Sequence, residues 1–214
     1  MNLGEIRAEV YKLVQDAGFA TTEVDSAIKE CYQFVADAVL IPDLKRIEHV
    51  STVADTPYLS LNGLKGGFSG KLRKVLRWDG ASPTVYANLE ELTKHYTVMT
   101  EPEYGNLEAV ALEGSTLWYQ KIPDPVALVT VLYYQNPSDL IDDDESPDII
   151  PGFLHRPLLV CGPAYILFNR LEDGIDGEKV NTASQLADYT RGLASYRAYI
   201  ARRRMHFISS RWDV

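Results

Sequence analysis

The longest apolar run of the chain extends from Pro157 to Phe168, inside the segment from Pro151 to Leu171. The run carries no charge. At roughly a dozen residues it is too short to cross a hydrocarbon core of about 30 Å, so a buried helix is expected. Pro157 suits the first turn of a helix, whereas Pro163 lacks a backbone donor and should kink or restart the helix. We take this run as the element around which the chain is organised.

A second helix is predicted after a polar turn that follows Arg170. From Glu178 onward, apolar residues recur at steps of three and four, a spacing that places them on one helix face. These residues include Val180, Leu186, Leu193 and Ile200. Residues 151–204 are therefore expected to form a helical hairpin.

Two amphipathic helices are predicted over residues 1–44. Asn2 is the expected cap of the first, which Gly18 should end. Thr22 with Asp25 resembles a capping box at the start of the second, which Pro42 should stop. Helices of this length cannot bury their apolar faces alone. A four-helix bundle made with residues 151–204 is the expected arrangement.

The apolar pattern between these helical pairs changes from a period near four to a period near two. Arg46–Val53 and Tyr58–Leu61 predict a hairpin, and the glycines of Leu64–Gly70 predict a loop. Leu72 to Trp78 should form a third strand that turns at Asp79-Gly80. Residues 45–138 are therefore expected to form an inserted antiparallel β unit, and the fold class is α+β.

The second half of this β unit has three further predicted elements. Asn88 should cap a short helix that runs to Tyr96. Leu107–Leu112 and Thr116–Gln120 should form a hairpin around Gly114. The segment from Val126 to Tyr134 is apolar on both faces, which favours the innermost strand.

An acidic loop is predicted over residues 139–150, where six carboxylates lie between Asp139 and Asp148. Such a density of oxygen ligands suits Ca²⁺ or Mg²⁺, but the alternating carboxylates and central glycine of an EF-hand loop are missing. A solvated loop that supplies negative charge near the helix beginning at Pro151 is the preferred interpretation, and no metal is assigned. Cys31 and Cys161 are expected to be small buried thiols.

The formal net charge of −9 argues against general affinity for nucleic acid or anionic membranes. Nevertheless, the five arginines between Arg197 and Val214 oppose a single acid, so this segment sums to +4 and the remainder to −13. A basic C-terminal segment on an otherwise acidic chain indicates that this segment binds its own partner. The predicted partner-binding residues are Arg202, Arg203, Arg204, Phe207, Ile208, Arg211 and Trp212.

No catalytic motif is found in the sequence. His49, His95, His155 and His206 are isolated from one another. Gly67–Gly70 is not a nucleophile elbow because Lys71 takes the place of the last glycine, and a phosphate-binding loop fails at two positions. We therefore expect a protein that is not an enzyme and uses no cofactor.

The order of these parts resembles a known family. Its features are Leu3–Arg7 on a first helix, Glu23–Asp25 opening the second, a hairpin like Thr52–Leu61, Leu117–Tyr119 before Pro123, the Val129–Pro137 strand, the acidic loop and Ile150–His155. The combination resembles the head-to-tail adaptor, or connector, proteins of tailed bacteriophages. The resemblance extends over residues 1–204.

The resemblance implies a structural virion protein made in the host bacterial cytoplasm. Its copies would form a ring, twelve-fold by family analogy, in the neck between capsid and tail. This ring would bind the portal protein and tail or neck proteins, and DNA would pass through it without specific binding. Residues 205–214 would be the portal-docking tail, and no membrane would be involved.

Two alternatives remain open from the residues themselves. One is a nucleic-acid-binding module, in which the arginine-rich end binds phosphates and Phe207 and Trp212 stack on bases. The other is a small hydrolase or transferase whose site is assembled from dispersed residues.

Overall fold

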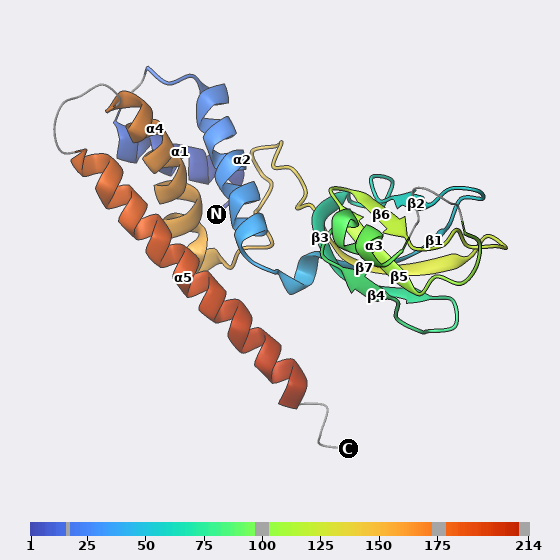
Figure 1. Ribbon diagram of the computed structural model, residues 1–214. Helices are drawn as coiled ribbons and strands as arrows, with labels where there is room; N and C mark the ends of the chain where they lie inside the picture. Colours follow the sequence, from blue (N-terminus) through green and yellow to red (C-terminus); the bar gives the residue numbers. More distant parts are fainter. Residues whose placement is uncertain (16–17, 97–102, 173–178, 210–214) are drawn as a thin grey trace. The chain divides into compact units, whose positions relative to one another are not determined.

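The computed structural model describes residues 1–15, 18–96, 103–172 and 179–209 (Figure 1). The fold is α+β, with five α-helices and two β-sheets in the described part of the chain. The chain divides into two compact units, one formed by Met1–Asp43 with Pro137–Val214 and one formed by Leu44–Asn136. None of the described helices has the length and apolar character needed to cross a membrane.

The helical unit contains four of the helices, and the apolar run lies at its centre. The helix built on this run contacts each of the other three. Its buried residues include Leu158, Leu159, Ala164 and Leu167. The four helices are α1 (Leu3–Val14), α2 (Thr21–Ala38), α4 (Cys161–Leu171) and α5 (Val180–Ser209). That they form a regular four-helix bundle stays a prediction.

The predicted cap of α1 is confirmed. The Asn2 side chain accepts a hydrogen bond from the Glu5 amide at 2.9 Å, and the Glu5 carboxylate accepts one from the Asn2 amide at 3.1 Å. The prediction that Gly18 ends the helix is wrong, because α1 already ends at Val14. Gln15 adopts the left-handed conformation there, with φ of 51°, and its amide closes the last turn.

The predicted capping box of α2 is wrong in its residues. The helix begins at Thr21, and the Glu23 carboxylate accepts a hydrogen bond from the Ala20 amide at 3.0 Å. Asp25 is not available as a cap because it pairs with Arg7 of α1. The Arg7 Nε and Nη2 atoms lie 2.6 and 3.0 Å from its two carboxylate oxygens. This forked pair joins the two N-terminal helices.

The sequence predicted a kink or restart of the helix at Pro163, and the structure has a π-helical turn that passes into α-helix two residues earlier, at Cys161. Arg156–Val160 form this turn, in which the Cys161 amide donates to the carbonyl of Arg156, five residues earlier. The α-helical pattern then begins at Cys161, so Pro163 falls in the first turn of α4. A missing backbone donor costs little in a first turn.

The acidic loop lies against the N-terminus of α1. The Leu3 amide donates to the carbonyl of Glu145 at 2.8 Å, and the Gly4 amide donates to the carbonyl of Asp143 at 3.0 Å. Arg7 also donates to the Asp143 carboxylate at 2.8 Å. Amides at the start of a helix have no partner inside the helix, so the loop satisfies two of them.

The β unit contains two sheets, which share a buried core between them. The first is antiparallel with the order β1-β7-β3, formed by Lys45–Ser51, Leu128–Gln135 and Phe68–Arg77. The second has the order β2-β6-β5-β4, formed by Tyr58–Ser60, Thr116–Tyr119, Ala109–Glu113 and Thr84–Tyr86. Helix α3 (Leu89–His95) has the predicted Asn88 cap.

Two predictions for the β unit are confirmed by the strand pairing. The strand β7 lies between β1 and β3 and is the innermost strand of its sheet. The β5–β6 hairpin also forms, with Gly114 at a φ of 59° in its turn. Glycine populates this conformation at low cost.

Three other predictions for the β unit are wrong. The hairpin between Arg46–Val53 and Tyr58–Leu61 does not form, because β1 pairs with β7 while β2 pairs with β6 and buries Leu59 in the core. The unit is not wholly antiparallel, since β4 and β5 run parallel. Part of the predicted Leu64–Gly70 loop is strand, because β3 begins at Phe68.

The close approach of α5 to the π turn gives a first prediction. A Cβ atom added at Gly192 would lie 2.8 Å from Pro157 Cβ and 3.2 Å from Leu158 Cδ2. Gly192→Val should therefore lower the free energy of unfolding by about 1–3 kcal/mol, measured by urea denaturation. Ala194→Val, at an exposed position of the same helix, should cost only about 0.6 kcal/mol from helix propensity. Equal losses in both variants would contradict the close packing.

His155 gives a second prediction because it is buried in the neutral form. Its Nε2 atom lies 2.8 Å from the carbonyl of Ile150, and its Nδ1 atom lies 3.1 Å from the Met1 amino group. A neutral ring with its proton on Nε2 satisfies both contacts. Burial lowers the pKa of His155 below the ordinary 6.5.

The unfolded chain therefore binds a proton at His155 more readily than the folded chain does. Stability should fall as the pH decreases from about 6.5 through the lower pKa of the folded state. His155→Gln should flatten this part of the dependence, measured as urea unfolding midpoints between pH 7.5 and pH 5. An unchanged slope in the variant would refute the role given to His155.

Candidate partner-binding surface

Five of the seven predicted partner-binding residues lie in the C-terminal part of α5. This helix packs on the rest of the helical unit through one face, which buries Tyr189, Leu193, Tyr196 and Ile200. The Tyr196 hydroxyl donates to the carbonyl of Ile149 and so links α5 to the segment that precedes the π turn. Beyond this point α5 continues past the ends of the other helices of its unit (Figure 1). The helix thus presents its basic end away from the core that holds it.

Arg202 and Arg203 differ in their surroundings although they are neighbours. Arg202 is exposed. Arg203 donates from Nη1 and Nη2 to the two carboxylate oxygens of Asp43, at 2.9 and 3.4 Å. These hydrogen bonds raise the pKa of Arg203. Any partner carboxylate that binds Arg203 has to compete with Asp43.

An aromatic cluster accompanies Arg203 on the same face of α5. The Arg203 guanidinium lies over the Tyr199 ring, 5.9 Å from its centroid. Tyr199 stacks on Tyr196 with a centroid distance of 6.4 Å and meets Phe153 edge-on at 5.7 Å. Phe153 is largely exposed. The cluster forms an apolar surface with a cation at its end.

This cluster was not identified from the sequence. The spacing of Tyr196, Tyr199 and Arg203 places them on one helix face, and this signal was available. Asp43 and Phe153 carried no such signal because their place beside α5 depends on tertiary packing. They belong to the same surface as the predicted residues.

The other predicted residues are only partly covered by the structure. Arg204, Phe207 and Ile208 lie on the helical backbone, which continues to Ser209, and their side chains lie outside the described part. Arg211 and Trp212 lie outside the described residues. Of the predicted docking tail over residues 205–214, the first part is thus helical.

Metal-binding clusters and reactive thiols are two groupings that catalysis can use, and both can be assessed in the described part of the chain. No group of three or more His, Cys, Asp and Glu side chains gathers there as a metal site would require. Cys31 and Cys161 are free and buried, as predicted. Burial raises the pKa of Cys31 to about 12 and also raises that of Cys161, which leaves both thiols poor nucleophiles.

Comparison with known proteins identifies one family. The family model described as "SU10 adaptor protein" matches residues 1–211. A search of the curated proteins finds no match.

The Asp43–Arg203 pair gives a third prediction. Both side chains are a third or more exposed, so Asp43→Asn should lower the free energy of unfolding by less than about 1 kcal/mol. The variant should nevertheless increase local opening at the end of α5. This should be measured as faster amide hydrogen exchange over residues 197–203. Asp139→Asn, an exposed acid of the same unit, is the control and should leave this exchange unchanged. Equal exchange in both variants would show that the pair does not hold the helix end.

Proposed function

Because the chain belongs to the SU10 adaptor protein family, we propose that it is a virion protein that forms the head-to-tail adaptor ring between portal and tail. The family match covers nearly the whole chain and confirms the resemblance to phage adaptors found in the sequence. Membership makes the protein a structural adaptor of phages rather than an enzyme. This full-length match is the observation that carries the proposal.

In this proposal, copies of the chain, twelve by family analogy, surround the axis along which DNA leaves the capsid. The ring lies in the neck and contacts the tail or neck proteins on its far side. The helical unit, as a four-helix bundle, is the rigid body of each copy. Outside Arg197–Val214 this unit carries nineteen acidic side chains against seven basic ones. Such a surface repels the duplex, which suits a channel that DNA passes without binding.

The C-terminal end of α5 is the proposed contact with the portal. It extends beyond the helices that hold it and carries Arg202, Arg203 and Arg204. The sequence that follows contributes the apolar Phe207, Ile208 and Trp212. Arginine forks bind carboxylates, and buried aromatic anchors carry much of the energy of protein interfaces. The +4 charge of this end also suits nucleic acid, so the test includes DNA.

Deletion of Arg202–Val214 should leave a folded subunit that no longer binds the portal. The buried residues of α5 in the described part of the helix, up to Ile200, precede the deletion, so the circular dichroism spectrum should be retained. In the full-length chain, Phe207→Ala with Trp212→Ala should weaken portal binding by at least about 30-fold. The control Arg170→Glu changes an exposed charge elsewhere and should have little effect.

Portal binding is measured by surface plasmon resonance and the complex by electron microscopy. Unchanged portal affinity after the deletion would end this version of the proposal. DNA affinity that falls steeply with salt and disappears with the deletion would favour the nucleic-acid-binding alternative.

A further inference from the structure

The outer face of the β1-β7-β3 sheet is apolar although it does not cover the core. Directly paired residues of antiparallel strands point to the same face. Ile47 pairs with Leu132, which also pairs with Lys74, and Thr130 pairs with His49 and Leu76. The face continues to the Ser51–Leu128 pair and, two residues beyond Leu76, to Trp78.

Three large apolar residues on this face are largely exposed. Trp78 is 75% exposed, Ile47 62% and Leu128 46%. The opposite face of the same strands holds Val75, Val129 and Val131, which are fully or almost fully buried. A sheet with one solvated face normally alternates apolar and polar residues. An apolar outer face of this kind marks an interaction surface.

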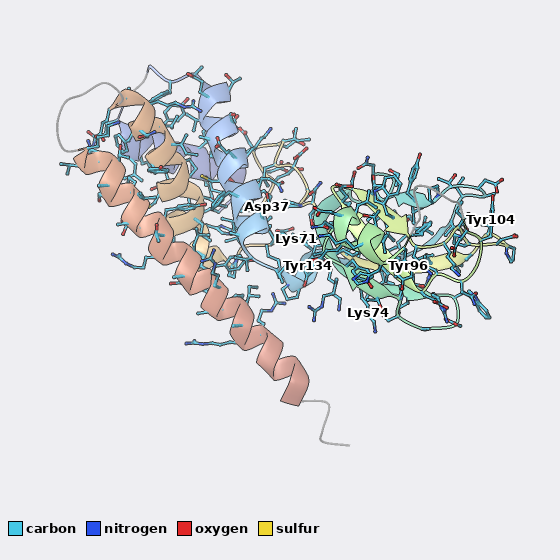
Figure 2. The ribbon with its side chains drawn as sticks, in the orientation of Figure 1. Asp37, Lys71, Lys74, Tyr96, Tyr104 and Tyr134 are labelled. Atoms are coloured by element: carbon cyan, nitrogen blue, oxygen red, sulfur yellow. The ribbon has the colours of Figure 1, made fainter. Side chains whose placement is uncertain are left out.

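The lysines that the strand pairing places on this outer face are Lys45, opposite Tyr134, and Lys74, opposite Leu132. The three strands carry six basic residues and one acidic residue. The acid, Glu48, is turned inward and accepts hydrogen bonds from the Tyr133 hydroxyl at 3.0 Å and the Lys65 amide at 2.9 Å. Lys74 lies at the surface of the unit (Figure 2). An apolar centre with a polar rim is typical of protein interfaces, whereas DNA interfaces are more polar and more positively charged.

A second apolar surface lies on the helical unit, in a groove of 320 Å³ between α2, α4 and α5. Its lining includes Phe34, Tyr165, Ile166 and Leu186, and Glu30 is the charged residue among its described lining residues. Phe34 is 54% exposed and Leu186 40%. This groove therefore has the same apolar character as the sheet face and the opposite charge.

We propose that the outer face of the β1-β7-β3 sheet of one copy packs on the α2/α4/α5 groove of a second copy. The cationic sheet matches the acidic helical unit, Lys74 faces the rim at Glu30, and Trp78 is the aromatic anchor. Each copy carries both surfaces, so the contact is head-to-tail and repeats from copy to copy, as a ring requires. The inference rests on the proposed function for the ring but names the surfaces that build it.

Cross-linking between distinguishable copies tests the contact directly. A tagged full-length Ser51→Cys chain, exposed beside Leu128, is mixed with an untagged Leu186→Cys chain and oxidised. A disulfide between the two chains is expected, at a level well above that of Ser51→Cys mixed with the parent protein. Any of three results would overturn the proposal. These are no disulfide above the control, a disulfide between two Ser51→Cys chains, or a disulfide that forms only within a single chain carrying both substitutions.

Assembly by light scattering gives an independent measure. Leu128→Glu should raise the concentration needed for assembly by about 30-fold, whereas Val85→Glu, 49% exposed on the other sheet, should leave it unchanged. Lys74→Glu and Glu30→Lys should each weaken assembly up to about fivefold, and their combination should restore it. Failure of the combination to restore assembly, or an equal effect of Val85→Glu, would overturn the contact.

The same variants separate this inference from the proposed function. Portal binding depends on the end of α5, so a chain carrying Leu128→Glu should still bind the portal. Normal assembly of the Leu128→Glu variant together with intact portal binding would refute the sheet contact and leave the adaptor role in place. If the parent protein binds duplex DNA and Trp78→Ala abolishes this binding, the sheet face is assigned to nucleic acid and the inference is overturned.

Discussion

The packing of the helices around α4 is the constraint on which the rest of the helical unit depends. Burying each large apolar side chain of this run contributes about 1.5–3 kcal/mol. A helix cap contributes about 1 kcal/mol, and an exposed ion pair contributes less. The π turn before Cys161 places Pro163 in the first turn of α4, so this apolar segment continues as a helix despite the proline. The contacts of α5 that hold its basic end follow from the same packing.

The helices could be predicted from the sequence because their signals are local. The three- and four-residue spacing of apolar residues identified all four long helices, and Asn2 and Asn88 were identified as caps. The errors arose where a distant residue changed the outcome. Asp25 was expected to cap α2, but Arg7, eighteen positions earlier, takes its carboxylate.

The strand pairing was less predictable for the same reason. The alternation of β1 and β2 was visible in the sequence, but their partners β7 and β6 lie more than fifty residues away. A period-two pattern identifies a strand and does not identify its neighbour. The candidate surface behaved similarly. The arginines of α5 were apparent from charge alone, whereas Asp43, Tyr199 and Phe153 became part of it only through packing.

The pairing of Lys45 with Tyr134 has a consequence for how the β unit is inserted into the chain. It places the beginning and the end of the β unit on adjacent strands, about 5 Å apart. The chain therefore leaves the helical unit and returns to it at neighbouring positions. A short linker between these positions would join the two helical segments directly. Removal or exchange of the whole insert would therefore leave the order of the helices unchanged.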